Sequence, residues 1–481
     1  MEIEQIKNFI NGEYFSYSKN TMDIINPNDA KKIGEVVLSE KEDVDYAVEV
    51  ALKAQKEWGE LNLKQRSKFF FKYLTLLETY KTELALCVKM ENGKDMEDAY
   101  AEVDKAIELC EFACSIPQQP LTTLSEVSKG IICNEEKRAL GVVASIAPFN
   151  FPVMVPHWTI LNAIMMGNAM ILKPSEITPI SGMKIAELFK KAGFPNGLLN
   201  IVNGGKECVE AICDNKDIKA ISFVGSTPIA KIVYKRATSN LKRALCLGGA
   251  KNFLILTPDA EPTMAVRDII ASFSGMNGQR CMAASVLVTV GDCNHIIEEI
   301  VSEVTKIKEE STLAPVISAQ AVTTLEAYIV DAKEKGAEIL VDGSNYKTQR
   351  NGYFFAPSII DYGKDISMDE EEIFGPILEI VTVDSLEEAI TLQNASPYGN
   401  GTSVFTQNGR VAEDAVKGLK AGMVGVNIGI PVPREPYSFG GIKESKFGYG
   451  DITGKTSIDF WSELIKVTTK YSGENKIDWM S

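Results

Sequence analysis

Residues 139–225 contain four short apolar runs, which are ALGVVASIA (139–147), NAMILK (168–173), GLLNIVN (197–203) and IKAISFVG (218–225). Helical stretches alternate with these runs, such as ISGMKIAELFKKAG (180–193) and PIAKIVYKRAT (228–238). Short strands of nearly continuous apolar sequence are typical of a parallel sheet that helices cover on both faces. The alternation therefore predicts an α/β fold and a nucleotide-binding domain.

The sequence on either side of this region extends the pattern. The first hundred residues read mostly as helix, with apolar residues at helical spacing from Val44 to Ala51 and a second helical run over 63–92. Beyond 225, a helix near 263–274 and the run ASVLVTV (284–290) restart the alternation, so a second α/β unit is expected to begin close to Leu254. A last β-like run, LIKVTTKY, closes the pattern at 464–471.

Length, composition and charge exclude several classes of protein. A chain of 481 residues is too long for one core and predicts two or three domains. The net charge of −15 makes the surface repel phosphate backbones, so no nucleic-acid partner is expected. The N-terminal sequence MEIEQIKNFINGEYF lacks a basic region followed by an apolar core, so neither a secretory signal nor a membrane anchor is expected, and the predicted location is cytoplasmic.

Two further features of the sequence argue against a membrane span and against a metal site. Residues 141–172 carry no charge, but Pro148, Pro152 and Pro156 interrupt them, and a buried strand and helix explain the stretch better than a span of about 20 apolar residues. The chain has nine cysteines without a CxxC pair and only two histidines. Disulfide frameworks and zinc clusters are therefore not expected.

The segment GMNGQRCMAAS (275–285) holds the best candidate nucleophile. Cys281 follows a loop of small residues and precedes the predicted strand 284–290. A thiolate attacks carbonyl carbon well and leaves well as a thioester, provided that nearby donors or cations lower its pKa, and Arg280 is adjacent. The alternative is a buried structural cysteine.

Seven ordered motifs resemble those of the aldehyde dehydrogenase superfamily, and the resemblance covers nearly the whole chain. They are IAPFNFP (146–152), LKPSE (172–176), FVGST (223–227), LGGAKN (247–252), GQRC (278–281), EEIFGP (371–376) and SFGGIKES (438–445). The sequence has no GxGxxG fingerprint, and this family does not use one. The resemblance implies two α/β domains with parallel sheets, one for the cofactor and one for catalysis, and a β arm for oligomerisation.

The resemblance also implies catalytic roles at matching positions. Cys281 would attack the aldehyde, and the side-chain amide of Asn150 with the backbone N–H of Cys281 would form the oxyanion hole. Asn150 between two phenylalanines could instead only shape a turn.

Nine positions match residues that hold the dinucleotide in this family. Lys173 and Glu176 match the binders of the adenosine ribose, and Glu372 and Phe374 match those that position the nicotinamide ribose and ring. A strand end capped by Ser175 and an acidic loop are the plainer explanations of these two motifs. Glu176 favours NAD, because a carboxylate accepts from a 2′-hydroxyl and repels a 2′-phosphate, although Lys173 leaves NADP open. The remaining matches are Ala147, Phe149, Gly225, Ser226 and Gly248, of which Gly225 and Ser226 lie at a turn suited to the pyrophosphate.

One departure indicates how the thioester is released. Where hydrolytic members have a glutamate that activates water, this chain has Cys246, a poor general base. The CoA-acylating methylmalonate-semialdehyde dehydrogenases are similar at this point, so coenzyme A is the predicted acceptor and a small semialdehyde the predicted substrate. A hydrolytic NAD(P)-dependent enzyme remains the alternative. A non-catalytic protein that keeps the fold is the third hypothesis, and the presence of both Cys281 and Asn150 argues against it.

Candidate substrate residues are cations and one histidine. Those relatives grip a substrate carboxylate with two arginines, and Arg280 matches one whereas Lys105 stands at the other, which loses the bidentate geometry. His157 and Arg434 are further candidates for an anionic substrate, with a packed histidine and a surface arginine as the alternatives. The segment 305–318 is shorter than is usual in the family.

The resemblance finally divides the chain. It implies a cofactor domain over 1–253, interrupted by bridging strands near 115–137, and a catalytic domain over 254–440. A C-terminal segment over 441–481 would add the oligomerisation strand near 464–472. In this family the arm completes a neighbour's sheet and hides strand edges, so a dimer or tetramer is expected.

Overall fold

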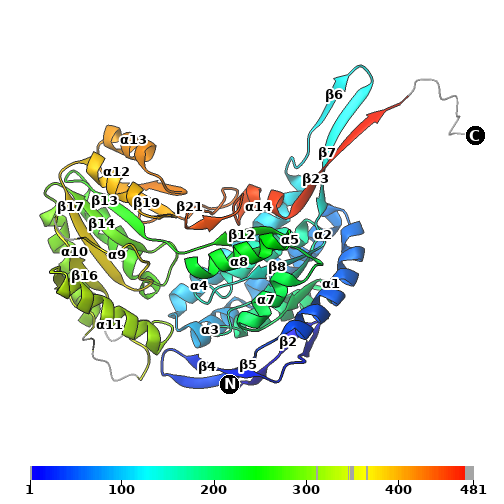
Figure 1. The fold of residues 1–481 in the computed structure, drawn as a ribbon, viewed down its shortest axis with the longest axis horizontal. Helices are drawn as coiled ribbons and strands as arrows, with labels where there is room; N and C mark the ends of the chain where they lie inside the picture. The colour runs from blue at the N-terminus through cyan, green and yellow to red at the C-terminus, as the bar shows by residue number, and fades with distance from the viewer. Residues whose placement is uncertain (1–2, 310–312, 345, 347–350, 365–366, 472–481) are drawn as a thin grey trace, which may run out of the picture.

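The protein consists of two lobes and a projecting arm (Figure 1). The computed structural model describes residues 3–309, 313–344, 346, 351–364 and 367–471. The first lobe contains the N-terminal half of the chain, and the second lobe lies beside it and contains residues 252–426, whose colours run from green through yellow to orange in Figure 1. The arm extends from the first lobe, which places the C-terminal strand beside segments from the first third of the chain.

The first lobe is built on an eight-stranded sheet of order β22-β12-β11-β8-β9-β10-β2-β3. From β12 to β10 the neighbours are parallel, and the outer strands β22, β2 and β3 are antiparallel. The four apolar runs of 139–225 form β8 to β11, which are almost entirely buried, as predicted. The strands are β2 (Asn8–Ile10), β3 (Glu13–Phe15), β8 (Val142–Ile146), β9 (Ala169–Lys173), β10 (Leu199–Ile201), β11 (Ile218–Val224), β12 (Arg243–Leu247) and β22 (Lys446–Phe447).

Helices of the first lobe surround this sheet. They are α1 (Lys41–Glu60), α2 (Leu63–Thr79), α3 (Lys81–Asn92), α4 (Met96–Ser115), α5 (Met154–Met165), α6 (Ile180–Ala192), α7 (Lys206–Asp214) and α8 (Thr227–Ser239). The predicted single run over 63–92 is two helices, because the backbone of Tyr80 leaves the helical conformation (φ −100°, ψ 15°).

The first 37 residues differ from the helical reading of the N-terminal hundred. Besides β2 and β3 they form β1 (Ile3–Ile6), β4 (Thr21–Asn26) and β5 (Lys31–Val37), which make a separate three-stranded sheet of order β1-β5-β4. These strands are short and mix exposed with buried positions. A window long enough to detect helical periodicity therefore gives them little weight against the long helices that follow.

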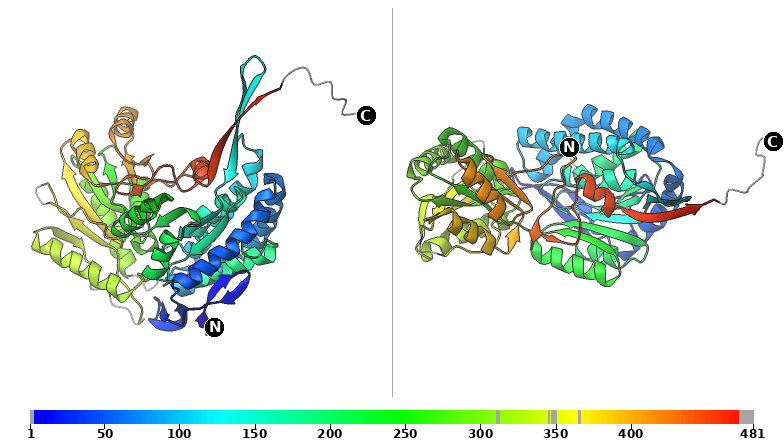
Figure 2. Two further views of the ribbon diagram at one scale, coloured as in Figure 1. Left: turned by 45° about the vertical axis from the view of Figure 1, so that its right-hand side comes forward. Right: turned by 90° about the horizontal axis from the view of Figure 1, so that it is seen from above.

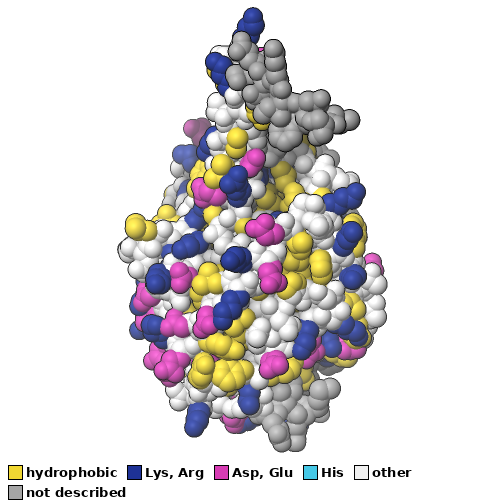
Figure 3. Space-filling model, turned by 90° about the vertical axis from the view of Figure 1, so that its right-hand side faces the viewer, with side chains coloured by type: hydrophobic (Ala, Val, Ile, Leu, Met, Phe, Trp, Pro, Cys, Tyr) yellow, Lys and Arg dark blue, Asp and Glu magenta, His cyan; other side chains and the backbone are white. Residues whose placement is uncertain are grey.

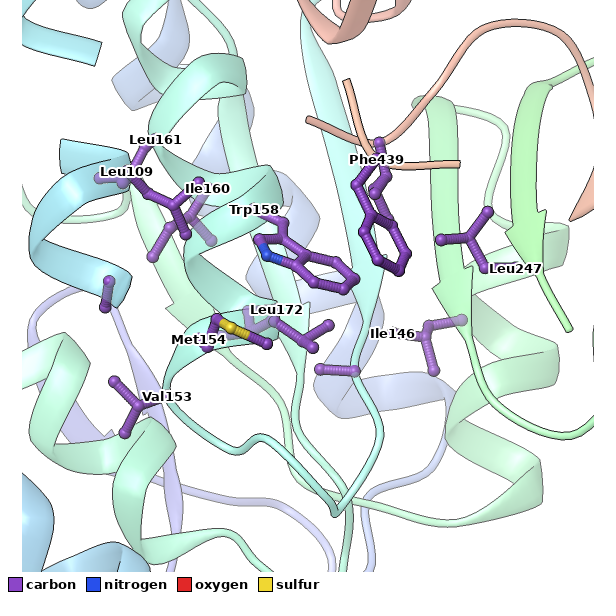
Figure 4. Close-up of a cluster of buried hydrophobic side chains, with 14 of the residues drawn as sticks. Leu109, Ile146, Val153, Met154, Trp158, Ile160, Leu161, Leu172, Leu247 and Phe439 are labelled. Carbon is purple, nitrogen blue, oxygen red and sulfur yellow. The ribbon is translucent and has the colours of Figure 1, made fainter. Parts of the chain in front are cut away.

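Helix α5 explains the uncharged stretch 141–172. All of its residues are buried, and so are those of β8 and β9 on either side of it in the sequence. Figure 4 shows Trp158 of α5 facing Phe439 from the C-terminal part of the chain, with ring centroids 4.7 Å apart. No helix in the described ranges combines the length and apolarity needed to cross a bilayer. The predicted cytoplasmic location stays a prediction.

The second lobe is built on a seven-stranded sheet of order β15-β16-β17-β14-β13-β19-β20. Its strands are β13 (Asn252–Leu256), β14 (Ala284–Val290), β15 (Glu338–Val341), β16 (Ser358–Asp361), β17 (Ile377–Val383), β19 (Gly401–Phe405) and β20 (Met423–Val426). Its helices are α9 (Pro262–Ser274), α10 (Asn294–Glu309), α11 (Ala319–Glu334), α12 (Leu386–Ala395) and α13 (Gly409–Gly418). The chain thus passes from the first sheet to the second between Leu247 and Asn252. Part of the shortened segment 305–318, residues 310–312, lies outside the described residues.

The C-terminal segment returns from the second lobe to the first. Strand β21 (Ile442–Lys443) pairs with β18 (Tyr398–Gly399), and β22 pairs with β12 of the first sheet. The N–H of Gly248 donates to the carbonyl of Ser445 at 3.0 Å. Helix α14 (Gly454–Phe460) follows. The first sheet therefore includes a strand that comes after both lobes in the sequence, and the division of the chain at 253 and 440 stays a prediction.

The arm is a three-stranded antiparallel sheet of order β23-β7-β6. It is made of β6 (Leu124–Ser128) and β7 (Ile131–Ala139), which follow the short helix η1 (Ile116–Gln118), and of β23 (Ser462–Lys470). It rises clear of both lobes in Figure 1 and in the left view of Figure 2. Leu124 is 72% exposed and Val127 58% exposed on β6, whereas Figure 3 shows charges of both signs scattered over the face of the lobe on the arm's side.

Candidate active site

A cavity of about 720 Å³ lies at the carboxyl ends of the parallel strands of the first lobe. Its walls include the segments that directly follow β8, β9, β11 and β12. Ligands of open α/β sheets bind at this edge, because the strand ends leave backbone groups and loops free there. The cavity is lined by every residue predicted for catalysis or for the dinucleotide, namely Ala147, Phe149, Asn150, Lys173, Glu176, Gly225, Ser226, Gly248, Cys281, Glu372 and Phe374.

Cys281 lies in a loop whose backbone is tightly constrained. The loop begins with η2 (Gly275–Gly278), where Met276 and Asn277 have positive φ values. Gly278 has φ +70°, and a Cβ there would lie 2.2 Å from the backbone of Gly375. Only glycine fits this approach. The close contact ties the Cys281 loop to the segment that carries Glu372 and Phe374.

Two buried amides fix the backbone of Cys281, and sequence reasoning missed both roles. The side-chain Nδ2 groups of Asn252 and Asn400 donate to the carbonyl of Cys281 at 2.9 and 3.0 Å. Asn252 also donates to Ala283 and accepts from the N–H of Gly401. Asn252 stands in the LGGAKN motif, but nothing in the sequence around Asn400 marks a partner more than a hundred residues away. Together they hold Cys281 in one backbone position.

Asn150 reaches the Cys281 loop from the first lobe. Its Nδ2 donates to the carbonyl of Gln279, two residues before Cys281, at 3.1 Å. The turn after it is fixed by Glu102 of α4, which accepts the N–H groups of Val153 and Met154 at 2.7 and 3.0 Å. These are the free donors at the start of α5. The side-chain amide is thus both buried and positioned beside the sulfur-bearing loop.

Two buried ion pairs support the turn that carries Asn150 and the segment that carries Glu372. Lys94 forms an ion pair with Glu102 and lies over the ring of Phe151, 4.1 Å from its centroid. Lys251 forms an ion pair with Glu379 at 2.7 Å and donates to the carbonyl of Glu371 at 3.3 Å. The first pair braces the turn that carries Asn150. The second braces the segment that carries Glu372.

The pKa of the Cys281 thiol is not lowered, although the adjacent Arg280 suggested that it would be. Burial raises its pKa to about 12, and the carboxylate of Glu372 adds to the rise. The guanidinium of Arg280 contributes only a small opposing effect, because it turns to Asp98 of α4 at 2.8 Å. The expected net lowering of the Cys281 pKa is therefore not found, because burial and Glu372 outweigh the small lowering effect of Arg280.

Glu372 and Phe374 form the far wall of the cleft. Glu372 accepts the N–H of Ala250 at 2.9 Å, and burial raises the pKa of its carboxyl to about 7. The ring of Phe374 meets that of Phe149 edge to face, 5.9 Å between centroids. Gly249 has to be small here, since a Cβ would lie 2.5 Å from the Glu372 carboxylate.

The opposite end of the cleft carries the residues predicted for adenosine and pyrophosphate. The Nζ of Lys173 is 2.7 Å from the carboxylate of Glu176. The N–H of Gly225 donates to the carbonyl of Leu247 at 3.2 Å, and Ser226 stands at the start of α8 without a side-chain cap bond. The Ser226 hydroxyl and the first N–H groups of α8 are therefore the groups that can meet a phosphate.

The thiol of Cys246 cannot act as a general base that activates water. It lies in β12 with no exposed surface, opposite Phe223 and Phe447 in the neighbouring strands. Burial raises the pKa of its thiol far above the usual range. A neutral, enclosed thiol cannot take a proton from water at neutral pH.

The structure does not place the predicted substrate residues in the cleft that holds Cys281. His157 is buried on α5, with Nε2 2.8 Å from the hydroxyl of Tyr73 and Nδ1 2.6 Å from the carbonyl of Val153. Burial lowers the pKa of His157 to about 4. Both ring nitrogens are used inside the protein, so the packed histidine is the alternative that applies and His157 is not a substrate ligand in this structure.

The three candidate cations are paired with carboxylates. Arg280 pairs with Asp98, and Lys105 lies 2.6 Å from Glu108. Arg434 is 76% exposed at its side chain and lies 3.2 Å from Glu108. None of them lines the cleft that holds Cys281. Among the described residues, no group of histidine, cysteine, aspartate and glutamate could hold a metal ion, and the cysteines are unbridged.

Comparison with known proteins gives a consistent result. The model of the aldehyde dehydrogenase family matches residues 14–467. A malonate-semialdehyde dehydrogenase of Bacillus cytotoxicus is 40% identical over 98% of this chain and 99% of its own. A crystal structure of a putative methylmalonate-semialdehyde dehydrogenase from Sinorhizobium meliloti, complexed with NAD, superposes with a TM-score of 0.96 at 38% identity and covers 99% of this chain and 100% of its own.

A second solved structure agrees with the first. The methylmalonate-semialdehyde dehydrogenase of Oceanimonas doudoroffii superposes with a TM-score of 0.95 at 37% identity, over 98% of this chain and 99% of its own. The predicted fold, two α/β domains with parallel sheets and a β arm, is confirmed by these likenesses. With a family match over almost its full length and relatives of this similarity, the chain belongs to the aldehyde dehydrogenase family.

Proposed function

We propose that the protein oxidises a small aldehyde with NAD through a thioester at Cys281 and passes the acyl group to coenzyme A. The observation that carries the proposal is the single cleft that Cys281 and Asn150 share with the residues predicted for the dinucleotide. The relatives are named for malonate and methylmalonate semialdehyde, which supports a small semialdehyde-sized substrate.

In the proposed reaction the thiol of Cys281 loses its proton and its sulfur bonds to the aldehyde carbon. The carbonyl oxygen becomes an oxyanion, which the Asn150 amide and the backbone N–H of Cys281 stabilise. Asn252 and Asn400 keep that N–H in place by holding the carbonyl of the same residue. Because the thiol proton has already left, loss of a hydride alone from this oxyanion adduct then gives the thioester.

The cleft fits the dinucleotide on several counts. NAD, when bound, supplies the hydride acceptor. Lys173 and Glu176 would hold the adenosine ribose, and the start of α8 would meet the pyrophosphate. Gly249 lets the Glu372 carboxylate approach the backbone, which holds that side chain in the cleft wall, and Phe149 and Phe374 supply apolar walls on the nicotinamide side. The crystal structure of the Sinorhizobium meliloti relative is a complex with NAD, which supports the same assignment.

We infer release of the acyl group to coenzyme A because the residue at position 246 cannot act as a general base for water. Cys246 is enclosed and neutral, so water has no activated route to the thioester through this position. A thiol acceptor is ionised to a greater extent near neutral pH than water and needs less help. Product analysis with a panel of small aldehydes, with and without coenzyme A, tests the proposal. Acyl-CoA and NADH in equal amounts support it, whereas fast formation of free acid alone would favour the hydrolytic enzyme.

We expect a preference for NAD over NADP. The Glu176 carboxylate can accept from a ribose 2′-hydroxyl and repels a 2′-phosphate, although its partner Lys173 can receive that phosphate if Glu176 turns away. Replacing Glu176 by Gln should narrow the preference, because the repulsion disappears while hydrogen bonding remains. The measurement is kcat/KM with both cofactors. A wild-type ratio in favour of NADP would refute the assignment.

The arm leads us to expect at least a dimer. An isolated three-stranded sheet with exposed Leu124 and Val127 leaves strand edges and apolar surface that a neighbouring copy can cover. Sedimentation at micromolar concentration should show a dimer or tetramer, and Leu124→Asp should weaken it. Leu86→Asp is the matched control, because Leu86 is 51% exposed on α3, which lies on the side of the first lobe away from the arm in Figure 1. A stable wild-type monomer would rule the prediction out.

A further inference from the structure

The side-chain amide of Asn150 has one N–H bond that is fixed inside the protein and one that is left over. Its Nδ2 carries two hydrogens, and one of them is donated to the carbonyl of Gln279 at 3.1 Å. The hydrogen bonds of the described residues include no second acceptor for this nitrogen. Because the two N–H bonds of a planar amide keep a fixed angle, the Gln279 carbonyl sets the direction of the second one.

Gln279 is held through both its backbone and its side chain. The residue is buried, and its N–H donates to the carbonyl of Met276 at 3.2 Å. Its Oε1 accepts the N–H of Ile317 at 3.0 Å, and its Nε2 lies 3.5 Å from the carbonyl of Pro315. The bond from Ile317 is the shorter and therefore the stronger of the two. The side chain thus anchors the backbone of Gln279, and with it the carbonyl that meets the Asn150 amide.

The segment that anchors Gln279 is the described end of the shortened stretch 305–318. The N–H of Val316 donates to the carbonyl of Tyr353 at 2.8 Å, and the N–H of Tyr353 donates to the carbonyl of Pro27 at 2.9 Å. Pro27 lies in the turn between β4 and β5, which belong to the first lobe. The anchor of Gln279 is therefore tied to the same lobe that carries the oxyanion-hole amide.

We propose that Gln279 is a positioning residue for the oxyanion hole, and that its anchored carbonyl directs the free N–H of Asn150 towards the aldehyde oxygen. The inference rests on the proposed function, because the oxyanion forms when Cys281 attacks the aldehyde. Gln279 is not among the residues that line the cleft, so it acts through Asn150 and not on the substrate. Its effect can be large because a donor stabilises an oxyanion only when it points at the position of that oxygen.

The test measures the first turnover after rapid mixing of enzyme and NAD with the faster substrate of propanal and 3-oxopropanoate, without coenzyme A. The slope of the burst rate against aldehyde concentration reports attack and hydride transfer. Gln279→Met keeps a similar volume but loses both side-chain hydrogen bonds, and it should lower this slope by at least about fivefold, since loss of a whole oxyanion donor costs about 10²- to 10³-fold. Gln279→Asn is the second variant should Gln279→Met fold poorly. Its amide is too short to reach Ile317, so it should lower the slope in the same direction.

Two further measurements separate positioning of Asn150 from general disruption of the Cys281 loop. Iodoacetamide reacts at a saturated carbon and forms no oxyanion, so its rate of alkylation of Cys281 should stay within about twofold of wild type in both Gln279 variants. In an Asn150→Ala background, Gln279→Met should change the slope by less than about twofold, because the amide that it directs is absent.

Gln393→Met is the matched control. Gln393 is a buried glutamine of α12, and its amide accepts the N–H of Lys420 at 3.2 Å and lies 3.4 Å from the carbonyl of the same residue. It does not line the cleft, so its replacement should leave the slope within about twofold of wild type.

Three results would overturn the inference while NADH formation still supports the proposed function. They are a smaller loss of slope in Gln279→Met than expected, an equal fall in the rate of alkylation, and an equal loss of slope in the Asn150→Ala background. Absence of NADH from the wild-type enzyme with every aldehyde would refute the proposed function as well.

Discussion

Replacing Cys281 by serine is expected to abolish NADH formation, with a loss of at least about a thousandfold in kcat/KM, while NAD still binds. A hydroxyl is far less nucleophilic than a thiolate at neutral pH, and a thousandfold corresponds to about 4 kcal/mol of barrier. The side chain does not hold the dinucleotide in our proposal, so a fluorescence titration with NADH should give a Kd close to that of wild type.

Alkylation of the cysteines provides the control for this prediction. With its pKa raised to about 12 by burial, Cys281 of the free enzyme is mostly protonated, so its labelling by iodoacetamide should accelerate as the pH rises from 7 towards 10. Aldehyde or cofactor should protect that residue, and peptide mapping should identify it. Labelling of Cys246 or Cys293 instead, together with an active Cys281→Ser variant, would show that the assignment of the nucleophile is wrong.

Without coenzyme A, the enzyme is expected to release a burst of about one NADH per active site and then to turn over slowly. The enclosed thiol of Cys246 stands where hydrolytic relatives carry their base, and loss of a positioned general base typically costs about 10²- to 10⁴-fold in rate. Rapid mixing with and without coenzyme A measures the burst and the steady rate. Coenzyme A should restore steady turnover and yield acyl-CoA.

Substitution of Cys246 tests the same step from the protein side. Cys246→Glu should shift the product towards free acid. Cys246→Gln should not, because glutamine has the shape of glutamate but cannot act as a base. Thermal unfolding of both variants shows whether the polar group is tolerated in β12, since the position is fully buried. Fast turnover of the wild type to free acid without coenzyme A would favour the hydrolytic alternative.

Much of the cleft could be predicted from sequence because its residues follow buried parallel strands. Strands such as β8 and β9 are apolar throughout, so they stand out, and the motifs after them fall at one edge of the sheet. Resemblance identifies the residues themselves, and their common location follows from the topology. The short strands β1 to β5 carry no comparable signal.

The partners of the site residues could not be predicted, because they come from distant parts of the chain. Arg280 meets Asp98 across 182 positions, and Asn400 meets Cys281 across 119. Neither contact leaves a local pattern in the sequence. The pKa of Cys281 likewise depends on burial and on Glu372, so the adjacent arginine indicated a shift in the wrong direction.

The return of the chain through β22 has a consequence for the integrity of the molecule. The lobes are joined once between β12 and β13 and again through the segment that leads to β21 and β22. A protease that cuts one of these connections therefore leaves two fragments held by the other connection and by the shared sheet. The two connections lie side by side, because the N–H of Gly248 in the first donates to the carbonyl of Ser445 in the second at 3.0 Å, so any relative movement of the lobes has to bend both connections at the same place.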